Sequence, residues 1–595
     1  MARFGTSFWG AFTGTLLAFF LFFVILFIGG LLMVGFFASG LSELGKEKTV
    51  KTKGSFLHLK LSGDIPDKPQ KDPLRKWMSA YYNSSVVSLP EIIHALKEAA
   101  QDEDIVGVFL ENPRTDAGLA TLEELRQALQ EFKKSSKPVM AYADYLDQRN
   151  YFLASVADSL FLNPAGSIGH VGLAAQFISF KNLLDKLEIK AQIIRPDSNA
   201  FKSAVEPFMY EKMSRANRQQ VRQLISNFWD YIVTAVAHNR KTNVDKVRQW
   251  ARELSGRNAM AALEDRMVDG LKYYDEMLET LKKISSTNSE KPNLIPLNGY
   301  LANSREKTST REKIVVIYAE GEITDDGSAS EQIVGSHYAG LLRTARQDDK
   351  VKGVILRVNS PGGSALASEI IHREVQLTKA VKPVYVSMGN YAASGGYYIS
   401  CAADSIFADF TTLTGSIGVF GVLPDMSAFF KNKIGIVRDT VLTERFSDIT
   451  TAGRTLSAAE MQIFKEEIQG IYQRFLKNVA EGRRKSLQEI HAMAQGRIWS
   501  GADAQRLGLV DRITPLEGAL ESMKLKLQKQ DISVEEWPKE RSLFNKIFLE
   551  NFESRFLGQL FLNNKSNIRR VINSIDYEML NNYKVWAISP IIQWI

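Results

Sequence analysis

The sequence predicts an α/β protein made of two tandem copies of one domain behind a single transmembrane helix. Three observations lead to this prediction. Short apolar, β-branched runs alternate with helical stretches, the same series of motifs occurs in both halves, and an uncharged apolar segment lies near the N-terminus. With 595 residues the chain is also too long for one ordinary hydrophobic core, so at least two domains are expected.

The N-terminal segment is the candidate membrane anchor. No residue from 4 to 42 is charged, and residues 8–37 are dense in Phe, Leu, Val and Ile. This stretch exceeds the roughly 20 residues that a helix needs to cross a bilayer, and it is too long for the apolar part of a typical cleaved signal peptide. We therefore expect residues 1–48 to be a retained anchor in membrane lipid.

The composition narrows the possible functions. Hydrophobic residues make up 45% and charged residues 24% of the chain, as in a globular protein. The net charge is +7, but Lys and Arg are interleaved with Asp and Glu, so no nucleic-acid partner is expected. A single cysteine, Cys401, excludes an internal disulfide and a cysteine-based metal cluster. Because HExxH and Walker motifs are also missing from the sequence, we expect no metal and no other cofactor.

An internal repeat follows the anchor. The series GVFL, KPV, a helical stretch and GSIG in the first half matches GVIL, KPV, a helical stretch and GSIG in the second. The corresponding residues are 107–110 and 353–356, 137–139 and 382–384, 151–162 and 397–408, and 166–169 and 415–418. We predict a first repeat at 49–284 and a second at 313–535. Residues 285–312 are the expected linker, and residues 536–595 are a tail of open function.

The second repeat carries a candidate nucleophile. Residues 383–388 form a strand-like run that ends at a Gly-Asn turn, and Ala393-Ser394-Gly395-Gly396 then leads into a helical stretch. A serine in such a turn can project its hydroxyl from a sheet edge, and Gly395 lets a backbone N–H approach a reacting carbonyl. A lone serine in a glycine-rich turn is more often a helix cap, but the neighbouring motifs favour a nucleophile.

Two further turns of the second repeat support this interpretation. The strand-like residues 351–358 run into Ser-Pro-Gly-Gly, whose Gly362 and Gly363 can aim N–H groups at the same oxyanion. Thr-Gly-Ser-Ile-Gly at 414–418 closes the segment. The first repeat has Glu-Asn-Pro-Arg at 111–114 where the second has SPGG, and Asp-Gln-Arg-Asn at 147–150 around the place of ASGG, so it has lost the nucleophile and its glycines.

The order strand, SPGG, helix, strand, ASGG, helix, strand and TGSIG resembles the Clp protease/crotonase superfamily. In detail it resembles the long, two-repeat form of the signal peptide peptidase A (protease IV) family, over nearly the whole chain after the anchor. The resemblance implies that each repeat is a ββα-spiral domain. It also implies a homotetrameric serine endopeptidase that cleaves remnant signal peptides and other short hydrophobic peptides.

The same resemblance assigns the general base. In this family the lysine of a KSAVEPF motif, supplied by the first repeat, forms a Ser/Lys dyad with the nucleophile, and residues 202–208 match this motif. Lys202 is then the base, Ser394 the nucleophile, and Ser416 the hydroxyl that orients the lysine. Such a lysine must be desolvated, since its pKa has to fall from about 10.4 towards the working pH. Glu206 would keep the lysine charged if it were paired with it, so we expect Glu206 to be structural.

Flanking charge and resemblance disagree about orientation in the membrane. Four lysines at residues 46–53 follow the apolar segment and only Arg3 precedes it, which by the positive-inside rule places the body in the cytoplasm. The family has its body on the outer side of the cytoplasmic membrane. Because large domains translocate despite such a bias, we expect a single-pass inner-membrane protein with a periplasmic catalytic body.

Two other functions stay open at this point. A crotonase-type acyl-CoA enzyme would share the spiral fold but would need carboxylates near the oxyanion glycines instead of a serine. A catalytically silent membrane scaffold would be favoured by loss of Ser394 or Lys202, and both are present. The intact ASGG and KSAVEPF motifs favour the peptidase.

Overall fold

The computed structural model describes residues 53–68, 87–285, 290–302, 312–328 and 332–539, as well as Phe22 and the backbone of a strand at 585–588. The predicted anchor at residues 1–48 therefore lies outside the described residues, apart from Phe22. Within the described part of the chain, no helix is both long enough and apolar enough to span a bilayer.

The first repeat is built on a parallel six-stranded sheet. Its strands, in sheet order, are β8 (Gly270–Leu271), β6 (Ser159–Gly169), β5 (Val139–Asp147), β3 (Ile105–Glu111), β1 (Ser55–Leu59) and β9 (Leu294–Pro296). Parallel neighbours need crossover connections, which α3 (Leu89–Gln101) and α4 (Leu119–Lys133) supply. Because the sheet is buried on both faces, strands such as β3 are nearly continuous apolar runs.

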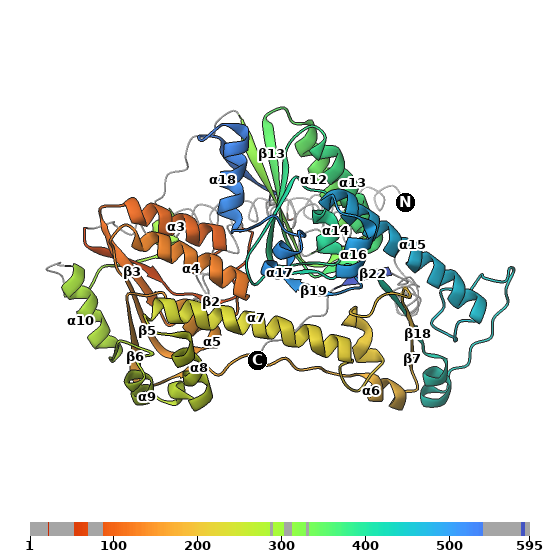
Figure 1. Cartoon of the computed structure of the whole chain (residues 1–595), viewed down its shortest axis with the longest axis horizontal. Coiled ribbons are helices and arrows are strands. Elements are labelled where there is room, and N and C mark those ends of the chain that lie inside the picture. The colour runs from red at the N-terminus through yellow and green to blue at the C-terminus, as the bar shows by residue number, and fades with distance from the viewer. Residues whose placement is uncertain are drawn as a thin grey trace, which may run out of the picture.

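The second repeat has the same order of elements. Its main sheet contains β19 (Ile498–Ser500), β17 (Leu413–Gly415), β15 (Val384–Ala393), β13 (Val351–Ser360), β10 (Lys313–Glu320) and β21 (Ser533–Trp537), with β16 (Ser405–Ala408) and β20 (Arg512–Ile513) beside β15. Helices α12 (Gly335–Gln347) and α13 (Ala365–Lys379) make the crossovers, and α18 (Leu516–Leu527) lies across the sheet from them (Figure 1).

Equivalent contacts confirm the duplication that the sequence predicts. Lys137 Nζ donates to two carbonyl oxygens at the C-terminal end of α3, and Lys382 Nζ donates to two at the end of α12. Each lysine precedes the proline of a Lys-Pro-Val sequence and ties the last turn of the crossover helix to the next strand. The protein is thus a mixed α/β protein of two repeats.

The segment expected to be a linker contains regular structure. Within residues 285–312, β9 pairs in parallel with β1, and α11 (Leu297–Ala302) buries Leu297 and Tyr300 against the first repeat. A strand of three residues has no periodicity to read, which is why the sequence does not show it. At the other boundary, β21 pairs with β10 as far as Trp537.

A third sheet joins the repeats. It has the order β12 (Ile333–Val334), β11 (Ile323–Thr324), β14 (Gly362–Ser364), β22 (Val585–Ile588), β18 (Phe420–Asp425) and β7 (Lys190–Ile194). Strand β7 comes from the first repeat and pairs antiparallel with β18 of the second. Helix α7 (Arg215–Asn239) continues this connection beneath the second repeat (Figure 1).

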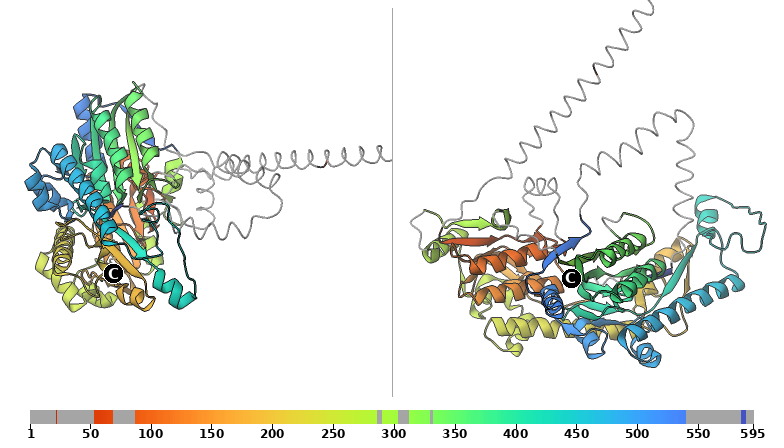
Figure 2. Two further views of the ribbon diagram at one scale, coloured as in Figure 1. Left: turned by 90° about the vertical axis from the view of Figure 1, so that its right-hand side faces the viewer. Right: turned by 90° about the horizontal axis from the view of Figure 1, so that it is seen from above.

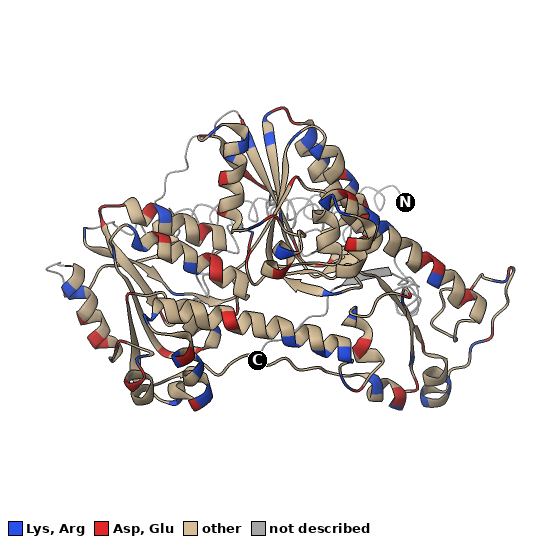
Figure 3. Ribbon diagram, in the orientation of Figure 1, with Lys and Arg blue, Asp and Glu red and all other residues tan. Residues whose placement is uncertain are grey.

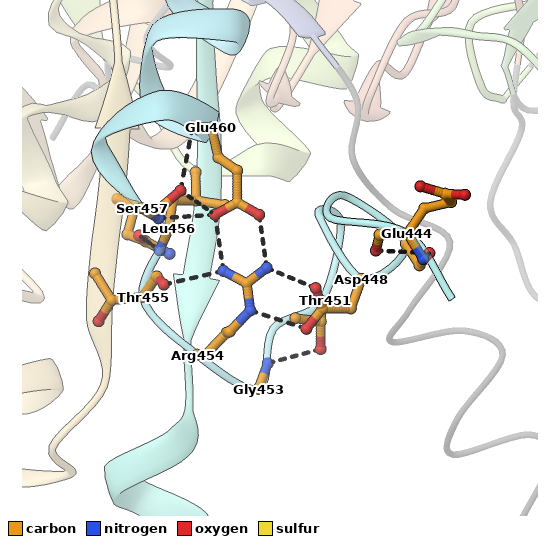
Figure 4. A network of polar contacts seen from close by, with 11 residues as sticks. Glu444, Asp448, Thr451, Gly453, Arg454, Thr455, Leu456, Ser457 and Glu460 are labelled. Atoms are coloured by element: carbon orange, nitrogen blue, oxygen red, sulfur yellow. Dashed lines mark hydrogen bonds and ion pairs between the residues drawn. The ribbon is translucent and has the colours of Figure 1, made fainter. Parts of the chain in front are cut away.

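A segment at residues 426–457 projects from the second repeat, as the two views in Figure 2 show. Arg454 fixes the C-terminal end of this segment. Its guanidinium donates to both carboxylate oxygens of Asp448 and to both of Glu460, at distances of 2.6 to 2.9 Å (Figure 4). Glu460 lies in the first turn of α15 (Ala458–Arg483), and the hydrogen bonds from Arg454 lower its pKa to about 2. The projecting segment is therefore tied to the N-terminus of α15.

Charges of both signs are interspersed over the helices in Figure 3. One group of charged side chains is buried between the repeats. Arg357 of β13 donates to Asp67, at 2.8 Å, and to Glu124 of α4, at 2.7 Å. Burial and the adjacent Glu124 raise the pKa of Asp409 well above its usual range. Burial also raises the pKa of Glu124, and the charge of Arg357 faces the carboxyl groups of Asp67 and Glu124 from the first repeat.

Candidate active site

Lys202 of the first repeat lies against the second repeat. It follows β7 and directly precedes the 3₁₀ turn η1 (Ser203–Phe208). The preceding N–H, that of Phe201, donates to the carbonyl of Gln495 at 3.0 Å, and Asn199 Nδ2 donates to the carbonyl of Val419 at 2.9 Å. On the other side, Gln220 of α7 donates to the Phe201 carbonyl at 3.0 Å. These contacts fix the segment that contains Lys202 against the second repeat.

Ser394 lies at the turn from β15 to α14 (Gly395–Ser400) with φ of 57°. A positive φ is uncommon for a residue with a side chain, so this turn is strained in the way of a nucleophile elbow. The Ser394 hydroxyl makes no capping bond to the helix. At the corresponding place in the first repeat, Asp147 has φ of −69° and accepts from the Asn150 N–H as an ordinary cap of α5 (Gln148–Ala154). The side chain of Ser394 therefore has no capping role, although its carbonyl accepts from the Tyr398 N–H.

The structure brings Lys202, Ser394 and Ser416 together. Lys202 Nζ lies 2.7 Å from Ser394 Oγ, 3.1 Å from Ser416 Oγ and 3.2 Å from the Ser416 carbonyl oxygen. The exposed fraction is 1% for Lys202 and 0% for each serine. Burial lowers the pKa of Lys202 well below its usual range, and no ion pair among the described residues opposes this shift. A neutral amine has two N–H groups for Ser416 and one lone pair for the Ser394 proton.

The three predicted oxyanion glycines also meet at this turn. A Cβ built on Gly395 would lie 3.1 Å from the Gly363 nitrogen and 3.2 Å from Gly362 Cα. Gly363 has φ of 153°, and a Cβ there would lie 1.9 Å from the Ile323 carbonyl oxygen, so no side chain fits. The Gly362 N–H already donates to Ser360 Oγ at 3.2 Å. Gly363 is paired with Ile323 of β11 on one side and with β22 on the other, so both glycines of the SPGG turn are held by β14 beside Ser394.

Other candidates considered in the sequence lie elsewhere. Glu206 accepts from the Ser214 N–H at 3.1 Å and from Asn217 Nδ2 at 2.9 Å, where it supports the start of α7. His491 is the one histidine that follows Ser394 in the sequence, and its Nδ1 lies 3.5 Å from the Tyr472 hydroxyl. Cys401 is fully buried in the core of the second repeat.

Sequence reasoning missed two residues that shape the lysine pocket. The Phe420 ring lies 6.0 Å from Lys202 Nζ and forms part of its apolar surroundings. A Cβ on Gly496 would lie 2.4 Å from Lys202 Cβ, so only glycine lets the backbone approach the lysine this closely. The only signal for Gly496 was its place in the GRIWSG stretch, which indicates a structural role.

The described residues of the first repeat contain no equivalent of this site. At the end of β3, Glu111 accepts from Lys60 Nζ at 3.0 Å and from the Tyr274 hydroxyl at 2.9 Å, and it lies 2.8 Å from His58 Nε2. Although burial raises its pKa, these hydrogen bonds together bring it down to about 2. An ionised, fully engaged carboxylate thus stands at the end of β3, at the position that corresponds to Arg357 of β13.

A serine at a strained strand-to-helix turn, beside a buried lysine and clustered glycine N–H groups, defines a serine hydrolase site. Comparison with known proteins gives the particular family. A family model described as Peptidase family S49 matches residues 131–288, which include Lys202, and residues 376–530, which include Ser394. The chain belongs to peptidase family S49 and is a serine peptidase.

Two of its relatives match most of the chain, and a third matches less than half of it. Protease 4 of Haemophilus influenzae is 37% identical over 533 residues, which is 86% of each protein. Serine protease SPPA, chloroplastic, of Arabidopsis thaliana is 30% identical and covers 80% of this chain and 69% of its own length. Putative signal peptide peptidase SppA of Enterococcus faecium is 35% identical over 42% of this chain and 75% of its own length.

Proposed function

We propose that this chain is a membrane-anchored endopeptidase in which Ser394 and Lys202 form a catalytic dyad that cleaves remnant signal peptides and other short hydrophobic segments. One observation carries the catalytic part of the proposal. Lys202 Nζ lies 2.7 Å from Ser394 Oγ inside a closed site, where burial lowers the pKa of the lysine well below its usual range. A neutral amine at hydrogen-bond distance from a serine hydroxyl is a competent general base.

Acylation follows from this arrangement. Ser394 Oγ bonds to the carbonyl carbon of the scissile peptide while its proton passes to Lys202 Nζ. The negative charge on the carbonyl oxygen is stabilised by the N–H groups of Gly395 and either Gly363 or Gly362. Lys202 then returns the proton to the leaving amine, the C–N bond breaks, and an acyl ester remains on Ser394.

Deacylation uses the same groups. Water attacks the ester as Lys202 takes its proton, and the bond to Ser394 Oγ breaks as that proton is returned to the serine. Ser416 keeps the amine aimed at the reacting atoms in both steps, since its hydroxyl and carbonyl oxygens lie 3.1 and 3.2 Å from Lys202 Nζ. No cofactor has a role in this sequence of steps.

The substrate class and location rest on two other features. The Enterococcus faecium relative carries the name of a signal peptide peptidase. The uncharged apolar stretch at residues 8–37 would hold this chain at the membrane, where such peptides are released. We infer a single-pass protein of the cytoplasmic membrane with the catalytic body on the outer side, and a ββα-spiral arrangement in each repeat.

A homotetramer is the proposed assembly. The projecting segment at residues 426–457 exposes several large apolar side chains, namely Ile434, Ile436, Val437, Val441, Leu442 and Phe446. Exposed apolar groups concentrated on one segment are typical of a protein interface. A second copy of the chain would cover them.

A fluorophosphonate labelling experiment tests the dyad. Ser394 Oγ should displace fluoride from the probe, and intact-mass analysis should show one adduct per chain, located on Ser394 by peptide mapping. Lys202→Met should abolish the adduct, whereas Lys212→Met, at an exposed lysine near the same segment, should keep it. An unmodified Ser394 in the folded wild-type protein would contradict the proposal and favour a silent scaffold.

A further inference from the structure

A strand of the C-terminal tail occupies the slot beside the active site. Strand β22 lies between β14 and β18 and is antiparallel to both. In register, Ile588 lies opposite Gly362, Ala587 lies opposite Gly363, and Trp586 lies between Ser364 and Phe420. Without β22, β14 and β18 would each present an unpaired edge, about 9–10 Å apart, which is the width of one added strand.

Both edges of this slot belong to the catalytic site. Strand β14 carries Gly362 and Gly363, which lie against the N-terminus of α14 next to Ser394. Strand β18 begins at Phe420, whose ring lies 6.0 Å from Lys202 Nζ. An extended peptide that adds to these edges therefore passes between the oxyanion side and the base side of the site.

The direction of β22 matches that of a substrate bound on its acyl side. The strand enters opposite Gly421 at Val585 and reaches the oxyanion glycines at Ile588. Its sequence, Val-Trp-Ala-Ile, is uncharged and apolar, like the peptides of the proposed substrate class. Main-chain pairing of this kind gives affinity that is largely independent of sequence.

We propose that Val585–Ile588 is an internal pseudosubstrate, which fills the acyl side of the substrate slot and competes with peptides. This inference rests on the proposed function for the identity of the competing ligand. A tethered segment acts at an effective concentration on the order of 1 mM, so an intrinsic dissociation constant of about 0.1 mM raises the apparent KM about tenfold. The tail thus occupies the substrate slot until the peptide concentration is high enough to displace it.

Two truncated forms test the kinetic effect with an apolar fluorogenic peptide. A chain that ends at Lys584 lacks β22 and should show a KM about tenfold below that of the full chain, with kcat within twofold. A chain that ends at Ile588 keeps β22 and should retain the full-length KM. Equal KM values in the two truncated forms would overturn the proposal.

A point variant in the full chain makes the same comparison without shortening it. Ala587→Pro removes the backbone N–H at the position opposite Gly363 and should lower KM as the loss of β22 does, while Ala587→Val keeps that N–H and the wild-type KM. An Ala587→Pro protein with unchanged KM would contradict the pairing.

Direct binding separates this inference from the proposed function. In a Ser394→Ala background, a fluorescein-labelled Val-Trp-Ala-Ile peptide should bind the form that ends at Lys584 at least tenfold more tightly than the full chain, as measured by anisotropy. Equal binding to both would refute the pseudosubstrate whether or not the enzyme turns over. Failed labelling of Ser394 by fluorophosphonate in the form that ends at Lys584 would instead refute the dyad.

Discussion

Replacing Lys202 by methionine separates the chemical role of the amine from its place in the structure. Methionine has nearly the volume of lysine and fits an apolar pocket such as the one beside Phe420. The variant keeps Ser394, the strained turn and the glycines, and loses only the base. Loss of a triad-type base lowers kcat by about 10⁴-fold or more, which corresponds to about 5 kcal/mol of lost transition-state stabilisation.

Folding should change far less than activity in this variant. The wild type holds a buried amine neutral at a cost in free energy, whereas methionine has no such cost. The variant instead leaves the hydroxyls of Ser394 and Ser416 with one partner fewer, at about 1–3 kcal/mol for a buried polar group. These effects oppose each other, so the free energy of unfolding should stay within about 2 kcal/mol of wild type.

The pH dependence gives a second measure of the same group. Because the folded-state pKa of Lys202 is lowered, the unfolded chain binds one proton more between that pKa and about 10.4, and stability rises with pH in this window. The rise should be about 1.4 kcal/mol per pH unit in wild type relative to Lys202→Met. The kcat/KM of wild type should rise through the same lowered pKa, since only the neutral amine accepts the Ser394 proton.

Urea titrations at several pH values and peptide hydrolysis under the same conditions provide both measurements. Lys212→Met serves as the matched control, and it should follow wild type in both. A Lys202→Met protein that is folded and keeps more than about 1% of wild-type kcat would refute the assignment of Lys202 as base, because another group would then be taking the proton.

Three further substitutions probe what positions the dyad. Gly496→Ala places a methyl group 2.4 Å from Lys202 Cβ at a φ of 77°. In steady-state assays kcat should therefore fall at least tenfold while KM changes little. A wild-type kcat would contradict the close contact between Gly496 and Lys202. Asn390 accepts from two N–H groups at the start of α4 across the repeat boundary, at 3.1 and 3.3 Å, so Asn390→Ala should lose about 1 kcal/mol in urea unfolding and Asn390→Asp should restore most of it. Arg357→Met leaves two buried carboxylates without their cation and should lose about 3–5 kcal/mol, and an unchanged unfolding midpoint would show that the cluster does not join the repeats.

The sequence predicted the parts of the site that have local signals. A strand-like run, a Gly-Asn turn and ASGG located Ser394 because a nucleophile elbow is a local structure. The duplicated motifs likewise predicted two α/β repeats. The lysine is different: it lies 192 residues from the serine, and a lysine in a polar segment has no local pattern that marks it as buried. Only the family resemblance identified it.

Other features arise only from the tertiary fold. Strands β9 and β22 have three and four residues, too few for a periodic pattern, and each exists because an edge of a sheet is available to pair with it. Arg357 lies within a largely apolar strand, and its two carboxylate partners come from the other repeat. The need for Gly496 likewise follows from contact with a residue of the other repeat.

The division of the dyad between repeats follows from what a lysine base requires. An amine is neutral near physiological pH only if water is excluded from it, and each pKa unit of that shift is worth about 1.36 kcal/mol. Here the exclusion is made by the contact itself, because Lys202 comes from one repeat while Ser416 and Phe420 come from the other. If the contact loosens, the lysine is hydrated, takes up a proton and stops acting as a base. The proposed dyad therefore couples activity to the docking of the repeats, and it gives the first repeat, which has no nucleophile of its own, a part in the site of the other.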